Sequence, residues 1–493
     1  MTPDTLARRG ARGGALVVSS QIVKLLLQAI GVVTLSRLLS PADFGLVAMV
    51  AVFIALGEIL RDFGLPTAAL QARELSRQQS SNLFWLNSLL GLSGATILAT
   101  SAPLIAIMYG EPALLAVAPA MAVTLLLSGL QAQVQVQLAR RMRYGVLAGT
   151  DVAAQSLGLV ASVSVAVVGG GYWALVIQVL VASFSLLVLR AIFLGQSPSW
   201  PRRNAGTRPL VVSGAQLGFA MLLSYAADNA DSLVIGVRWG PVSLGYYNRA
   251  FQLFAIPKAG ILSALTQVVL PVVNSATSAG RAAVDVLMRV QFSLGFALTG
   301  IYLLLATGAD WVIPLVLGAQ WQNSIPIFQV LCVAGAISSF SNTTYWAFVA
   351  EHKSGLLLRL HLVTKPLIII SVVVGAQFGV IGAAVGYSVG AIVSWPISIS
   401  WLARAVDSRY LNFLWSAGLV LFAGVAGFAA GETAGFLARD LGWGRGMATA
   451  AASATAYLLT IIVVPLGREG IRGAVRLARE LVTRGRRLRG EQN

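Results

Sequence analysis

Residues 172–194 have the sequence YWALVIQVLVASFSLLVLRAIFL, an almost unbroken apolar run. About 20 such residues in helical form cross the hydrocarbon core of a bilayer. Inside that core every backbone N–H and C=O group must bond within the protein, and an α-helix achieves this within one segment. This stretch is therefore predicted to be a membrane-spanning helix.

The rest of the chain has the same character. Of its 493 residues, 57% are hydrophobic and 11% are charged, whereas average soluble chains carry about 25% charged residues. The predicted spans number fourteen: 13–39, 42–61, 82–109, 112–137, 147–169, 172–194, 211–237, 242–272, 284–308, 323–349, 355–377, 380–402, 410–430 and 446–466. No segment between them is long enough for a separate soluble domain. The predicted fold class is all-α, a polytopic membrane protein.

Basic side chains occur in every second loop, and the loops between them are nearly bare apart from 431–445. The basic groups are Arg8, Arg9 and Arg12; Arg73 and Arg77; Arg140, Arg141 and Arg143; Arg202, Arg203 and Arg208; Arg281 and Arg289; Lys353 and Arg359; Arg404 and Arg409; and the tail. Cytoplasmic loops retain Lys and Arg. An even number of spans with two basic ends therefore predicts that both termini are cytoplasmic. The net charge of +17 follows from this topology, or from an anionic lipid substrate, and does not indicate nucleic acid.

An internal repeat divides the spans. The sequence SPADFG at 40–45 is matched by GPVSLG at 240–245, each at a predicted outer turn. Transporters built from two such parallel repeats bind substrate at the repeat interface, near the middle of the bilayer. The predicted organisation is a six-helix lobe, a second six-helix lobe, an additional helix pair and a basic cytoplasmic tail, at residues 1–200, 208–405, 410–466 and 467–493. The tail either lies on anionic lipid as an amphipathic helix or only fixes the topology.

Several spans contain ionisable groups, which in a membrane usually face a cavity or one another. We predict a hydrated cleft between the lobes, in which three cations bind a phosphate-bearing headgroup: Lys24, Arg249 and Lys258. Three carboxylates are candidates for coupling to a proton or ion: Glu58, Asp228 and Asp231. A purely structural alternative pairs Glu58 with Lys258, because the repeat offset of 200 relates these two positions.

Motifs for catalysis or cofactors are missing from the sequence. The chain has one cysteine, Cys332, so no intrachain disulfide is possible, and its two histidines are not accompanied by a cysteine cluster. We therefore predict no metal site. There is no Gly-Lys-Ser/Thr phosphate loop and no nucleophile elbow, so the sequence predicts neither an ATP motor nor an enzyme, and no cofactor.

Two segments resemble a known family. The first is LSRLLSPADFG at 35–45, and the second is DNADSLVIG at 228–236 followed by GYYNRA at 245–250. They resemble the polysaccharide transporter, or oligosaccharidyl-lipid flippase, family, whose superfamily also contains multidrug and toxin extrusion pumps and lipid II flippases. The resemblance covers about residues 1–466.

That resemblance implies 12 or 14 helices in two lobes, alternating access and cationic lumen residues. It implies a substrate, an undecaprenyl-diphosphate-linked oligosaccharide destined for O-antigen, capsule or exopolysaccharide. It also implies a multi-pass protein of the bacterial inner membrane that works with membrane lipid, glycosyltransferases and a polysaccharide polymerase.

Two alternatives stay open. A cation-coupled multidrug exporter of the same superfamily should have an acidic lumen, whereas the candidate lumen here carries more Lys and Arg. A membrane-embedded polymerase or ligase usually needs a large outer loop, and the longest outer loop predicted here is only 431–445.

Overall fold

The computed structural model describes residues 3–62, 65–72, 75–195, 198–202, 225, 229–277, 281–351, 353–406, 410–439, 443–465 and 467–472. Throughout these ranges the regular structure is helical and no strand occurs. The chain divides into two compact units, Met1–Gly245 and Tyr246–Asn493. The all-α fold predicted from the sequence is therefore confirmed.

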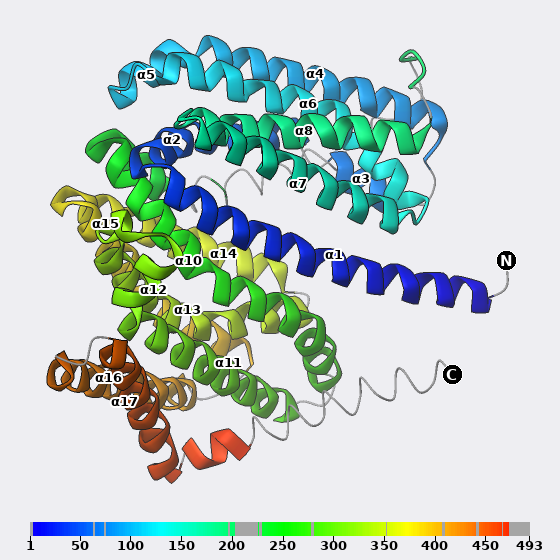
Figure 1. Ribbon diagram of the computed structural model, residues 1–493. Helices are drawn as coiled ribbons and strands as arrows, with labels where there is room; N and C mark the ends of the chain where they lie inside the picture. Colours follow the sequence, from blue (N-terminus) through cyan, green and yellow to red (C-terminus); the bar gives the residue numbers. More distant parts are fainter. Residues whose placement is uncertain are drawn as a thin grey trace. The chain divides into compact units, whose positions relative to one another are not determined.

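Among the described residues of the first unit, eight helices precede α10 (Figure 1). They are α1 (Pro3–Leu38), α2 (Pro41–Asp62), α3 (Leu65–Gln71), α4 (Arg77–Thr100), α5 (Ala102–Tyr109), α6 (Leu114–Arg140), α7 (Tyr144–Val167) and α8 (Trp173–Leu194). The main packing pairs are α7 with α8, α4 with α6, α6 with α8, and α1 with α7. Helix α1 approaches α7 closely at Gly31, where an added Cβ would lie 3.2 Å from Leu159.

The predicted span 82–109 consists of two helices, α4 and α5, because Pro103 interrupts it. Proline has no N–H with which to continue the backbone hydrogen-bond ladder. The N–H of Ser101 still bonds to the carbonyl of Ile97, and a new helix then begins at Ala102. The left-handed conformation of Gly110 (φ 69°) ends that helix, as glycine commonly does.

The repeated motif marks two helix beginnings that contact each other. Ser40 and Asp43 form reciprocal side chain–backbone hydrogen bonds at the start of α2, the geometry of a capping box. Helix α10 (Ala230–Thr277) breaks at Gly240, whose backbone is non-helical (φ 75°, ψ −176°). A second helical stretch then starts at Pro241, the repeat equivalent of Pro41.

The contact between the motifs is reciprocal. A Cβ added at Gly45 would lie 1.8 Å from the carbonyl oxygen of Pro241, and one added at Gly245 would lie 2.0 Å from that of Pro41. Both distances are far shorter than a carbon–oxygen contact allows, so only glycine fits either position. Each copy of the motif thus packs against the other through the same two residue types.

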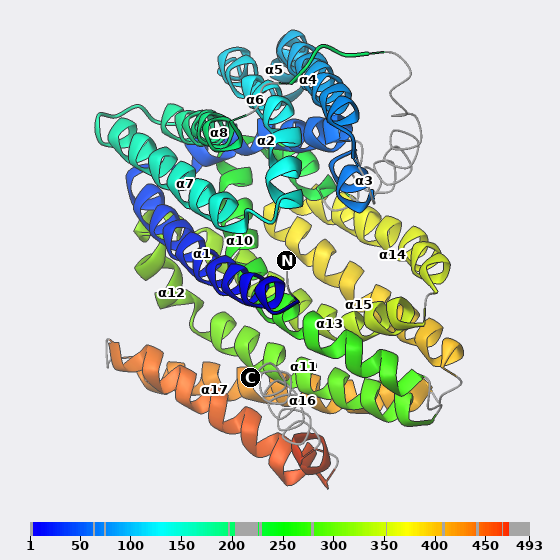
Figure 2. The same cartoon turned by 90° about the vertical axis from the view of Figure 1, so that its right-hand side faces the viewer.

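The second unit begins within α10 and continues to the end of the described chain (Figure 2). Its other helices are α11 (Arg281–Thr307), α12 (Ala309–Val316), the 3₁₀ turn Ala319–Trp321, α13 (Ser324–Ala350), α14 (Ser354–Gly375), the 3₁₀ turn Ala376–Phe378, α15 (Val380–Ala405), α16 (Tyr410–Leu437) and α17 (Trp443–Val463). Neighbouring helices α14 and α15 pack together, and α13 packs on both α11 and α15.

The last two helices, α16 and α17, form a pair that packs on α11. A buried apolar cluster joins the three elements, and it includes Phe292, Leu303, Val420 and Tyr457. Both helices lie in the segment 410–466, which is predicted from the sequence to be an additional helix pair, and both belong to the second unit. The proposed domain boundaries themselves stay a prediction.

Within the described ranges, twelve helices are long and apolar enough to cross a membrane: α1, α2, α4, α6, α7, α8, α11, α13, α14, α15, α16 and α17. Most of the predicted seventh span, 211–237, lies outside the described residues. The predicted eighth span falls in α10, whose apolar character is interrupted by Arg249 and Lys258. The polytopic architecture is confirmed, and the total of fourteen stays a prediction. The tail beyond residue 472 also lies outside the described part.

Candidate functional site

Helix α1 presents a polar stripe that contains one of the predicted site residues. Gln21, Lys24 and Gln28 are spaced at three and four positions, so they lie on one face of the helix. The Lys24 ammonium is 3.1 Å from Oδ2 of Asp151 on α7. One turn along α7, the amide of Gln155 donates a 3.5 Å hydrogen bond to the Lys24 carbonyl. Lys24 is thus held at the α1–α7 contact by an ion pair that involves a carboxylate within the bundle.

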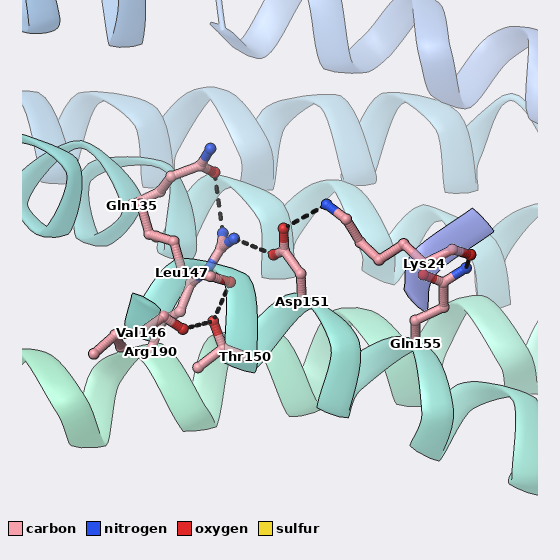
Figure 3. Close-up of polar contacts among 8 residues, drawn as sticks. All are labelled: Lys24, Gln135, Val146, Leu147, Thr150, Asp151, Gln155 and Arg190. Carbon is pink, nitrogen blue, oxygen red and sulfur yellow. Dashed lines mark hydrogen bonds and ion pairs between the residues drawn. The ribbon is translucent and has the colours of Figure 1, made fainter. Parts of the chain in front are cut away.

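Asp151 also binds a second cation, so it bridges three helices (Figure 3). Nη2 of Arg190 on α8 lies 2.6 Å from Oδ1 of Asp151. The second terminal nitrogen of the guanidinium group, Nη1, donates a 3.0 Å hydrogen bond to the side-chain oxygen of Gln135 on α6. The neighbouring Thr150 hydroxyl bonds to carbonyls of its own helix and leaves the carboxylate to the two cations.

The three charged side chains differ in accessibility. The side chain of Arg190 is 4% exposed, that of Asp151 is 27% exposed and that of Lys24 is 30% exposed. One carboxylate between two cations leaves a net charge of +1. Hydrogen bonds from cations to phosphate oxygens are among the strongest in proteins. The Lys24–Asp151–Arg190 cluster can therefore accept an anion at its accessible, Lys24 side.

The cluster lies toward one end of the helices of this unit. Gln135 is close to the end of α6 at Arg140, and Asp151 is close to the start of α7 at Tyr144. The loop between these helices carries Arg140, Arg141 and Arg143, so the cluster is near a basic loop.

Two of the predicted coupling carboxylates, Glu58 on α2 and Asp231 at the start of α10, lie in the first unit. The Tyr225 hydroxyl donates a 3.0 Å hydrogen bond to the carbonyl of Val52 on α2. Tyr225 thereby connects to α2, the helix that carries Glu58. Asp231 is buried and accepts a 2.7 Å hydrogen bond from the backbone N–H of Ser232. The third candidate, Asp228, lies outside the described residues.

The remaining predicted cations, Arg249 and Lys258, lie on the part of α10 that belongs to the second unit. Arg249 donates to the side-chain oxygen of Gln252. Lys258 donates a 3.0 Å hydrogen bond to the hydroxyl of Ser338 on α13. That these two residues share one binding site with Lys24 stays a prediction, as does the alternative pairing of Glu58 with Lys258.

Sequence reasoning missed Asp151 and Arg190, the partners of Lys24. The available signal was a charged residue inside each of the apolar spans 147–169 and 172–194. Throughout the described ranges, no three His, Cys, Asp or Glu side chains are grouped in a way that could hold a metal ion.

Comparison with known proteins adds related sequences. Residues 34–326 match the family described as "Polysaccharide biosynthesis protein". The chain is 23% identical over 414 residues to the lipopolysaccharide biosynthesis protein WzxC of Escherichia coli (strain K12), covering 80% of this chain and 82% of that protein. It is 25% identical over 344 residues to the succinoglycan biosynthesis transport protein ExoT of Rhizobium meliloti (strain 1021), covering 68% of each.

Solved structures share the fold. The lipid II flippase MurJ, in an inward closed conformation, matches with a TM-score of 0.67 at 13% identity, over 90% of this chain and 98% of that one. An inward-facing multidrug resistance transporter of the MATE family matches with a TM-score of 0.58 at 15% identity, over 78% and 94%. The resemblance inferred from the motifs at 35–45 and 228–250 is thereby confirmed. The family match spans more than half of the chain, and this protein belongs to the polysaccharide biosynthesis protein family.

Proposed function

We propose that this protein is a flippase that moves a lipid-linked oligosaccharide across the bacterial inner membrane for polysaccharide biosynthesis. Family membership, the relatives WzxC and ExoT, and a fold shared with MurJ support this function. The lipid would be undecaprenyl diphosphate, and the polysaccharide would be an O-antigen, a capsule or an exopolysaccharide. Translocation without bond breaking would make the protein a transporter and not an enzyme.

The observation that carries the headgroup assignment is the excess of positive charge around Asp151. Lys24 and Arg190 share one carboxylate, and Lys24 keeps nearly a third of its side chain accessible. A diphosphate supplies several oxygens for such a cation. We assign Lys24 to headgroup binding, with Arg249 and Lys258 as further cations of the same path.

The basic loop beside the cluster supports a cytoplasmic position for it, because Lys and Arg are retained on that side. Lipid-linked sugars would then enter the protein at the end where Lys24 lies. In this proposal both termini are cytoplasmic, and glycosyltransferases that deliver the substrate work on the same side. A polymerase would use the product on the opposite side.

A transmembrane gradient is the proposed energy source, because the sequence contains no nucleotide-binding motif. Glu58 and Asp231 are the proposed coupling carboxylates; the burial of Asp231 supports this, because ionisable groups inside a membrane usually have a function. Asp228 belongs to the same proposal on sequence grounds alone.

Gene deletion with complementation tests the function. Deletion should deplete surface polysaccharide and leave its lipid-linked unit at the inner leaflet. Wild-type protein should restore export, and Lys24→Arg should restore more of it than Lys24→Gln, because Arg keeps the positive charge. Asp310→Asn is the control, since this exposed carboxylate lies on α12 of the second unit. Normal export in the deletion strain would refute the proposal.

The multidrug exporter is the competing transporter function, and it shares the fold. Cationic drugs would be repelled by a cluster with a net positive charge. If the charge reversals Lys24→Glu and Lys258→Glu left export unchanged and altered drug tolerance, the drug exporter would replace the flippase.

A further inference from the structure

Asp151 holds its two cations unequally. Arg190 is nearly inaccessible and is fixed at two points, by Asp151 at 2.6 Å and by Gln135 at 3.0 Å. Lys24 contacts the other carboxylate oxygen at 3.1 Å, with 30% of its side chain exposed. Arg190 is therefore the fixed partner of Asp151, and Lys24 is the partner that can leave.

Release of Lys24 would not leave an unpaired charge behind. A buried charge that loses its counter-ion is strongly destabilising, but Asp151 would still bind Arg190 and form a neutral pair. The lysine ammonium is a compact charge on a flexible four-carbon chain, so it can exchange one anion for another without movement of the helix backbone. The cluster thus has the charge balance that an exchange requires.

We propose that Asp151 is an internal anion, which neutralises Lys24 in the empty transporter and is replaced on Lys24 by the diphosphate of the substrate. Asp151 then recaptures Lys24 when the substrate leaves, and so promotes release. This role rests on the proposed function, because it takes the diphosphate headgroup of a lipid-linked sugar as the competing anion. It makes Asp151 a residue that sets affinity through Lys24 without contacting the substrate.

Substitutions of Asp151 and of Arg190 should change the affinity for an external anion in opposite directions. Asp151→Asn removes the competitor, so an external diphosphate should bind more tightly and leave more slowly. Arg190→Gln makes Lys24 the main counter-ion of Asp151, so release of Lys24 becomes more costly and the diphosphate should bind more weakly. A purely structural cluster would weaken binding in both variants.

Binding is measured on the full-length protein in lipid nanodiscs, with inorganic pyrophosphate as the probe and the shift of the thermal unfolding temperature as the readout. The pyrophosphate concentration giving half of the maximal shift should fall about tenfold in Asp151→Asn and rise by a similar factor in Arg190→Gln, a typical size for coupled binding. Asp310→Asn, the same chemical change at an exposed site, should match the wild type. If Asp151→Asn does not fold, the double variant Asp151→Asn, Arg190→Gln takes its place, because it replaces the ion pair by neutral groups of similar size. This double variant should also bind pyrophosphate more tightly than the wild type.

Transport assays in proteoliposomes add a kinetic readout. In Asp151→Asn both KM and kcat for the lipid-linked substrate should decrease, because binding tightens and release slows.

Unchanged or weaker pyrophosphate binding by both Asp151 variants would overturn the inference. A failure of the proposed function is distinguishable, since Lys24→Gln would then leave pyrophosphate binding unaltered. If Lys24→Gln weakens pyrophosphate binding but the Asp151 variants do not tighten it, the exchange of anions on Lys24 is refuted and the proposed function stands.

Discussion

At the scale of single residues, Arg190 is the structural centre of the cluster. It is 4% exposed and holds both Asp151 and Gln135. Replacement by Met should destabilise the protein by about 1–3 kcal/mol, because the partly buried Asp151 carboxylate loses its 2.6 Å ion pair and keeps only the 3.1 Å contact with Lys24. The double variant Arg190→Met, Asp151→Leu should recover part of this loss, since the carboxylate that has lost its shorter ion pair is then removed as well.

Chemical denaturation in detergent micelles measures both variants against the wild type. Met447→Leu, at an exposed apolar position on α17, serves as a neutral control. Equal stability of Arg190→Met and the wild type would show that the arginine is not needed for the charge balance described here.

The sequence indicates that Lys24 needs a polar partner or a cavity, but it does not identify the partner, for a physical reason. A lysine deep in an apolar run is expensive wherever it lies, so its presence alone indicates a function or an ion pair. Which helix supplies the counter-ion depends on how α1, α7 and α8 are rotated against one another. Apolar faces that meet lipid and apolar faces that meet protein look alike in sequence, so this rotation is not encoded in the periodicity.

At the scale of elements, the glycines of the two repeated motifs set the approach of α2 and α10. Gly45→Ala and Gly245→Ala should each destabilise the first unit by about 1–3 kcal/mol, since the new methyl group would overlap a backbone carbonyl that cannot rotate away. Gly149→Ala on α7 is the matched control, because nothing lies within 4 Å of its added Cβ. That control should be neutral or stabilising, as alanine favours helix.

Thermal unfolding of the three variants in one detergent compares them directly. If Gly45→Ala and Gly149→Ala had the same midpoint, the close contact with Pro241 would not contribute to stability. The motif itself was predictable as a repeat at matching turns, but its mutual contact was not, because a repeat in sequence does not specify which surfaces of the two copies meet.

At the scale of the whole molecule, the alternation of basic loops predicts the orientation. In a Cys332→Ala background, a cysteine at Gly170, between α7 and α8, should react with a membrane-impermeant maleimide in intact cells. A cysteine at Met142, between α6 and α7, should react only after permeabilisation, because the arginines on both sides hold this loop in the cytoplasm. The reverse pattern would place the Lys24 end of the bundle outside and contradict loading from the cytoplasm.

Twelve of the predicted spans correspond to helices able to cross a membrane within the described chain, since length and hydropathy are local properties that sequence records well. The stretch around α10 was harder to predict. Its charges and its break at Gly240 interrupt the long apolar run by which the other spans are identified.

The reciprocal contact of Pro41 and Gly45 with Pro241 and Gly245 limits which substitutions the two motifs can accept in evolution. Each glycine provides the space that the opposite proline carbonyl needs, so drift in one copy after a duplication is opposed by the unchanged copy. The two segments, 200 positions apart, therefore constrain each other's substitutions. Among proteins related to this chain, we expect the two glycines to be conserved together or replaced together.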